Sequence, residues 1–258
     1  MMRVLLLVFT ALVLAFLVLP ILVVLPISFS SGTVLTLPTP GWSLRWYADF
    51  LNSGRWLHAT ANSLIVGTAT AMLATLLGTL AAVGIHLGRF RWRSLLLAML
   101  SVPIVVPWVI AGVAMYFAFA AVGLAGTLPG LILAHSVLAL PFVVLTVLAS
   151  LQRFDPTLLR AAASCGAPLP LALRRVLAPM VAPGIAAGAL FAFAVSFDEV
   201  IVAVFIAGPE QFTLPRQMLA GVREFLSPTI CAAAVVLTAV SLLLLALASR
   251  VRGIVPQT

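Results

Sequence analysis

The sequence predicts an all-α, polytopic membrane protein with six transmembrane helices, folded as a single transmembrane domain over residues 1–258. Three observations support this fold class. Hydrophobic residues make up 64% of the chain and charged residues only 8%, against about 25% charged residues in soluble proteins. Apolar runs of about 20 residues, the length that spans a bilayer, recur along the chain. The segments between them are short, and arginines cluster beside alternate runs.

The first span is expected from Val4 to about Ile27. This run is longer than the core of a secretory signal peptide, and no small-residue cleavage site follows it, so we expect an uncleaved helix. Arg3 then places the N-terminus in the cytoplasm. Residues 28–58, rich in Pro, Ser and Gly, are predicted to form the first external loop. The aromatic residues expected at the membrane interface are Trp42, Trp46, Tyr47 and Trp56.

The second and third spans have contrasting compositions. The second, from Ala59 to about Leu87, carries small residues that favour close helix contacts in lipid. Its glycines are Gly67, Gly78 and Gly84. The third, from Leu95 to about Val122, contains residues that interrupt a helix and free backbone carbonyl groups, so we expect it to line a cavity; a simple packing kink is the alternative. These residues are Pro103, Pro107 and Gly112.

The fourth span, Gly130 to Leu151, contains His135. A single histidine in such a span is expected to form a hydrogen bond between helices, and no metal site is predicted. The fifth span, about Gly184 to Ala207, has two carboxylates near its middle, and the sixth runs from Thr229 to Ser249. Short outer segments at 123–129 and 208–228 precede the fourth and sixth spans.

Asp198 and Glu199, the two carboxylates of the fifth span, are the main candidate site among the charged residues. A charged side chain in hydrocarbon costs about 2.5–3.5 kcal/mol on an insertion scale. Neighbouring helical residues point about 100° apart. Because exposure of a carboxylate to lipid is unfavourable, at least one of the two should face the bundle interior or a water-filled path. The pair therefore lines a cavity passed by a cationic or amine-bearing solute, or it forms a structural ion pair or helix contact.

The basic residues support six spans with both termini in the cytoplasm. All 14 are arginines, and ten fall on the predicted inner side against four outside, in agreement with the positive-inside rule. The inner arginines are Arg3, Arg89, Arg91, Arg93, Arg153, Arg160, Arg174, Arg175, Arg250 and Arg252. The outer ones are Arg45, Arg55, Arg216 and Arg223. We therefore attribute the net charge of +8 to membrane topology and lipid contact, with no nucleic-acid partner.

Motifs for catalysis are absent from the sequence. The chain has no lysine, so it cannot supply the lysine of a nucleotide-binding P-loop. It also lacks the H-E-x-x-H, C-x-x-C and G-x-S-x-G patterns of metalloprotease, thiol-redox and serine-hydrolase sites. We therefore expect no enzymatic activity and no cofactor in this chain.

The stretch from Arg153 to Pro183 is a predicted cytoplasmic insertion. Asp155-Pro156 suits a helix start, and helix-forming residues continue to Cys165. Gly166 is expected to end this helix, since prolines follow it. A second short helix is expected over residues 171–177. The predicted shape is a helix, a glycine turn and a helix outside the bilayer.

This stretch resembles the EAA loop of binding-protein-dependent ABC importer permeases, with the pattern E-A-A, three residues, G, nine residues, I-x-L-P. The resemblance implies a type I (MetI-like) permease whose loop contacts a cytoplasmic ATPase dimer, which itself uses the ATP. The residues carried over to the coupling loop are Arg160, Ala161, Ala162, Gly166, Ala167, Arg174, Arg175, Val176 and Pro179. Two departures are Arg160 at the position of the family's glutamate and Ala178 at that of its leucine. Arg174 and Arg175 are expected to contact the ATPase or lipid headgroups, or to serve topology alone.

Other segments resemble the second permease of spermidine/putrescine-type importers. These segments are His135 with 140–146, 196–200, 208–209 and 213–215. The resemblance implies alternating access with a periplasmic binding protein and a second permease, in a heterodimer in the bacterial inner membrane. The residues assigned to the translocation path are Pro107, Trp108, Asp198 and Glu199. Trp108 stands where polyamine permeases often carry an acid, although a tryptophan face can also hold a cation.

Several alternatives stay open at this point. Permeases for aminoethylphosphonate, opines and ferric iron are similar in many of the same segments. An ion-coupled secondary transporter could use Asp198 and Glu199 without an ATPase. The third class of function, after an ABC permease and a secondary transporter, is a membrane scaffold that transports nothing.

Overall fold

The computed structural model describes residues 2–88, 91–224 and 226–253, and about four fifths of them lie in helices. Within these ranges the only extended pairing is an isolated bridge between Ser30 and Trp42. The helices are α1 (Met2–Ser28), α2 (Arg45–Asn52), α3 (Gly54–Leu87), α4 (Arg93–Val105), α5 (Trp108–Ala121), α6 (Leu128–Leu151), α7 (Thr157–Ser164), α8 (Leu169–Ala172), η1 (Leu173–Leu177), α9 (Ala178–Phe197), α10 (Ile201–Ile206), η2 (Pro209–Gln211), α11 (Leu214–Glu224) and α12 (Thr229–Gly253). The all-α prediction is confirmed.

The described residues contain four helices long and apolar enough to cross a membrane. They are Leu5–Ser28, Gly54–Leu87, Leu128–Leu151 and Leu169–Phe197. The bent pair of α4 and α5 makes a fifth if the two helices together form one span, and α12 holds a shorter apolar stretch at Thr229–Leu244. The predicted third span is therefore not one straight helix, because α4 and α5 meet at an angle of 104° around Val106 and Pro107. Proline and the extended backbone of Val106 explain the break.

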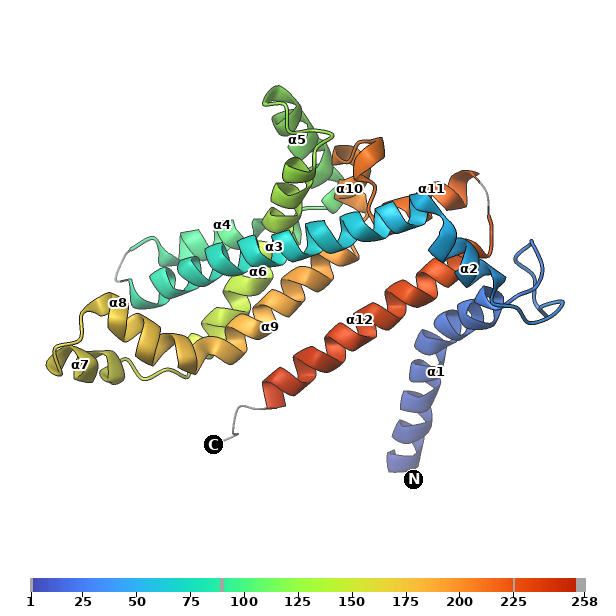
Figure 1. Ribbon diagram of the computed structural model, residues 1–258. Coiled ribbons are helices and arrows are strands. Elements are labelled where there is room, and N and C mark those ends of the chain that lie inside the picture. The colour runs from blue at the N-terminus through green and yellow to red at the C-terminus, as the bar shows by residue number, and fades with distance from the viewer. Residues whose placement is uncertain (1, 89–90, 225, 254–258) are drawn as a thin grey trace.

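The centre of the molecule is a bundle of α3, α6 and α9, which make the most extensive helix contacts (Figure 1). Gly78 of α3 and Gly188 of α9 both lie against Val143 of α6, and a Cβ atom on Gly78 would be 2.8 Å from that side chain. Glycine at these positions lets the backbones approach closely. The expectation of close contacts is confirmed for Gly78. Gly84 makes no such contact within this chain, because it is exposed and an added Cβ atom would meet nothing within 4 Å.

A second apolar cluster joins α3 and α6 to the helices that follow the two breaks, α5 and α10. Its buried members include Leu131 and Leu138 of α6 with Val202 and Ile206 of α10. α5 packs on α10 beside this cluster. The backbone N–H of Gly126, in the turn between α5 and α6, donates a hydrogen bond of 2.8 Å to the carbonyl oxygen of Ile206. The α5–α6 turn and the end of α10 are thus directly connected.

The first loop and its aromatic residues differ from the prediction. The loop contains α2, and α3 begins at Gly54, earlier than expected. Trp46 and Trp56 are buried against other parts of the protein, whereas Trp42 is 73% exposed. Among the three tryptophans, Trp42 alone therefore has the exposure expected of an interfacial anchor.

In Figure 1 the N-terminal end of α1 and the C-terminal end of α12 point toward the bottom, α7 and α8 lie at the lower left, and α2 and α11 lie on the right. α1 stands at the edge of the molecule and packs mainly against α12. None of its most apolar stretch is buried within this chain. Arg89 and the last five residues lie outside the described residues, as do the side chains of Arg250 and Arg252.

Candidate functional site

The predicted cytoplasmic helix and its glycine turn are present at α7. Gly166 has a φ of +81°, a value that glycine adopts without the strain imposed on other residues. The Gly166 N–H donates to the carbonyl oxygen of Ala163 at 2.9 Å, and the Ala167 N–H donates to that of Ala162 at 3.0 Å. These two bonds form a Schellman motif. The prediction that Gly166 ends the helix is confirmed.

The start of this segment is fixed by Asp155. Its carboxylate accepts hydrogen bonds from the backbone N–H of Thr157 at 2.8 Å and from the hydroxyl group of Thr157 at 2.6 Å. These bonds favour the charged form and lower the pKa of Asp155. The carboxylate therefore stays ionised at neutral pH and holds the first turn of α7.

The second predicted helix is not a separate element. α8, the π-helix η1 and α9 follow one another without a gap, so the helix that we expected at residues 171–177 continues into the fifth span. The continuous helix that contains the predicted fifth span therefore begins at Leu169 instead of Gly184. Pro183 lies inside α9 and does not end the helix. The segment has a helix, a glycine turn and the exposed end of a long helix, here called the knob (residues 153–177).

The knob is packed onto the main bundle. Phe154 and Leu177 are buried in the same apolar cluster as residues of α3, α6 and α9, with Leu159 and Val176 packed against it. The predicted coupling residues lie on or near the surface of the knob, except Pro179, which lies in the first turn of α9. Arg160, Ala161, Gly166, Arg174, Arg175 and Pro179 are exposed, and Ala162, Ala167 and Val176 are half-buried. The knob thus presents a surface while its base is held by the bundle.

The carboxylates expected in the middle of the fifth span lie at a break in it. α9 ends at Phe197 and α10 begins at Ile201, so Asp198 and Glu199 occupy the connection. Their environments differ, because Asp198 is exposed and Glu199 is 1% exposed. The prediction that Asp198 and Glu199 lie near the middle of one continuous helix is therefore wrong. The break lets the two neighbouring carboxylates occupy different surroundings.

Glu199 caps α10. One of its carboxylate oxygens accepts the N–H of Val202 at 2.6 Å, and the other accepts that of Ala203 at 3.0 Å. These are two of the N–H groups that a helix start leaves without partners. The carboxylate also lies 3.3 Å from Nε2 of His135, without an aligned hydrogen bond from that nitrogen.

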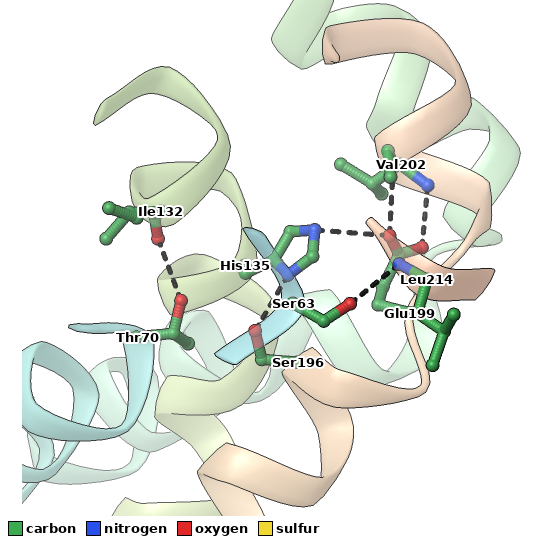
Figure 2. Close-up of polar contacts among 9 residues, drawn as sticks. Ser63, Thr70, Ile132, His135, Ser196, Glu199, Val202 and Leu214 are labelled. Atoms are coloured by element: carbon green, nitrogen blue, oxygen red, sulfur yellow. Dashed lines mark hydrogen bonds and ion pairs between the residues drawn. The ribbon is translucent and has the colours of Figure 1, made fainter. Parts of the chain in front are cut away.

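His135 lies between Glu199 and Ser196, as Figure 2 shows. Its Nδ1 and the Ser196 hydroxyl group are 2.8 Å apart, and the imidazole is fully buried. The predicted helix-to-helix hydrogen bond of His135 is confirmed. Its partner could not be identified from the sequence pattern, because Ser196 and His135 are 61 residues apart.

The other two predicted path residues lie at the break between α4 and α5. Pro107 precedes α5 and is exposed, and Trp108 begins α5 and is half-buried. α5 is brought against α10, with Gly112 facing the ring of Phe205. The helix after the first break, α5, thus packs against the helix after the second break, α10. Within the described part of the chain, no three His, Cys, Asp or Glu side chains are grouped as metal ligands.

Comparison with known proteins identifies the family of this chain. Residues 74–257 match the family of binding-protein-dependent transport system inner membrane components. The spermidine/putrescine transport system permease protein PotC of Escherichia coli (strain K12) is 32% identical over 89% of this chain and 87% of its own length. The putrescine transport system permease protein PotI of the same strain is 34% identical over 85% and 80%, respectively.

Solved structures share the fold. A chain of a bacterial ABC transporter involved in the import of alginate superposes with a TM-score of 0.77 at 16% identity, covering 99% of this chain and 96% of its own. A chain of the MetNI methionine ABC transporter gives a TM-score of 0.64 at 18% identity, covering 78% and 96%. The family comprises transport subunits rather than enzymes. The chain therefore belongs to the multi-pass inner-membrane permeases of binding-protein-dependent ABC import systems.

Proposed function

We propose that this chain forms half of the translocation path of an ATP-driven importer for spermidine, putrescine or a related amine. The observation that supports the substrate class most strongly is the identity of 32% and 34% to two polyamine-system permeases over most of the chain. The exposed carboxylate of Asp198 at a helix break adds a chemical reason, since a polyamine is a cation. Broken membrane helices supply substrate sites in other transporters.

The proposed assembly has a cytoplasmic ATPase dimer, a second permease and a periplasmic binding protein. The permease has six spans, with both termini in the cytoplasm and the knob on the ATPase side. The knob transmits the movement of the ATPase, because its base shares an apolar cluster with α3, α6 and α9. Asp198, Glu199, Pro107 and Trp108 belong to the path region, and ATP is used by the partner subunit.

Transport assays in proteoliposomes test this function. The purified complex, with its ATPase, second permease and loaded binding protein, should take up labelled spermidine or putrescine only when ATP is present. Labelled aminoethylphosphonate, opines and ferric iron are tested in parallel as competitors for the role of substrate. Uptake driven by an ion gradient without ATP would contradict the proposal and favour a secondary transporter. Transport of one of the competitors instead of an amine would overturn the substrate class alone.

Substitution of Asp198 tests the carboxylate directly. We expect Asp198→Asn to lower ATP-dependent amine uptake by about tenfold, because a hydrogen bond to a charged group contributes about 1.5–3 kcal/mol and tenfold corresponds to about 1.4 kcal/mol. Asp198→Glu keeps the charge and should retain at least about half of the uptake. Equal uptake by the Asp198→Asn variant and the unsubstituted complex would remove Asp198 from the path.

A further inference from the structure

The carboxylate of Glu199 is fully engaged within the protein. It accepts two backbone N–H groups of α10 and contacts the ring of His135, and almost none of its surface is exposed. Cargo could bind this carboxylate only by displacing the cap, which would leave the N–H groups of Val202 and Ala203 buried without partners. The adjacent Asp198 is exposed. Glu199 is thus occupied by contacts within the protein, whereas the carboxylate of Asp198 is accessible.

His135 connects Glu199 to the rest of the bundle. The imidazole belongs to α6, its Nδ1 pairs with Ser196 in the last turn of α9, and its Nε2 faces Glu199 just before α10. All three side chains are at most 3% exposed. The ring is therefore hydrogen-bonded to α9 on one side and lies against the carboxylate that caps α10 on the other (Figure 2).

We propose that His135 is a positioning residue for transport, which acts through Glu199 to fix the direction of α10 and so to place the Asp198 carboxylate on the path. The inference rests on the proposed function and deepens it, because it assigns cargo contact to Asp198 and helix capping to Glu199. His135 itself contacts no cargo. Ser196 contributes by holding the ring in the orientation that reaches Glu199.

The chain offers a matched control beside this histidine. Ser136 is the next residue of α6 and is 5% exposed, but its hydroxyl group donates only to the carbonyl oxygen of Ile132 in the same helix. Ser136→Ala therefore removes a buried polar group of α6 without disturbing the link to α10. Ser196→Ala removes a similar hydroxyl group together with the contact to His135.

The first measurement is the amount of spermidine or putrescine moved per ATP hydrolysed by the reconstituted complex. We expect His135→Leu to lower this ratio by about fivefold or more. Ser196→Ala should lower the ratio as well. His135→Gln should retain at least about half of the ratio, because an amide offers both a donor and an acceptor. Ser136→Ala should leave it unchanged. A merely structural role would reduce the amount of folded complex and leave the ratio of the surviving complex unaltered.

An unchanged ratio in the His135→Leu variant, or equal losses in the Leu, Gln and Ser136→Ala variants, would overturn the positioning role. Those results leave uptake by the unsubstituted complex intact, so they are distinct from failure of the proposed function, in which that complex shows no ATP-driven uptake.

Thermal unfolding of the purified chain in detergent tests the link between His135 and Glu199 without transport. His135→Leu and Glu199→Gln should each lower the midpoint temperature. The double variant should unfold close to the less stable single variant, because residues that act together give non-additive effects. Additive losses would show that His135 does not act through Glu199 and would overturn the inference.

Discussion

Gly166→Val should lower uptake per ATP hydrolysed by about tenfold or more while the protein still reaches the membrane. The left-handed conformation of Gly166 costs other residues about 1–2 kcal/mol, and a β-branched side chain is a strong outlier there. The Schellman bonds at the end of α7 would be lost or distorted, so the exposed surface of the knob would change direction. A Cβ atom at this position meets no atom within 4 Å, and the rest of the fold should therefore be preserved.

The control for this prediction is Gly166→Asn. Asparagine tolerates the left-handed conformation better than other non-glycine residues, so this variant should retain clearly more uptake per ATP than the valine variant. The measurements are ATP hydrolysis and amine uptake by the same proteoliposomes, with the amount of permease determined on immunoblots. Normal ATP-driven uptake by the Gly166→Val variant would count against a coupling role for the knob.

Gly184→Leu should prevent accumulation of folded permease in the membrane. A Cβ atom on Gly184 would overlap the side chain of Ser150 and lie 3.3 Å from the carbonyl oxygen of Thr146. Both neighbours belong to α6, so α9 and α6 would have to separate in the central bundle. Overpacking in a well-packed core typically costs about 1–3 kcal/mol, and a displaced helix adds the loss of neighbouring contacts. The yield of monodisperse protein in detergent measures the effect.

Two variants separate this clash from a general effect of adding an apolar side chain. Gly84→Leu makes the same change on α3, where a Cβ atom meets nothing within 4 Å, and it should leave the yield unchanged. Gly184→Ala should lower the yield, and adding Ser150→Gly should restore part of it by removing the overlapped side chain. A high yield of the Gly184→Leu variant would show that α6 and α9 tolerate a wider separation.

The sequence predicted those features that depend on local chemistry. The apolar runs identify α1, α3, α6 and α12, and the Gly-Pro pattern correctly locates the end of α7. The break after Phe197 was missed because apolar residues resume directly after Asp198 and Glu199 and no proline marks the boundary. The contact between Glu199 and His135 was also missed, because the two residues lie far apart in the sequence. Long-range packing, rather than local propensity, decides these features.

The continuity of α8, η1 and α9 determines how deep each part of the knob lies relative to the lipid. The 20 residues of α9, at about 1.5 Å per residue, match the hydrocarbon thickness of about 30 Å. A bilayer that takes α9 as its span leaves Leu169–Leu177 projecting about 13 Å beyond it. The arginines of η1 then lie about 5 Å past the hydrocarbon boundary, level with the lipid phosphates. The Gly166 turn lies farther out, in water, where a soluble subunit can reach it.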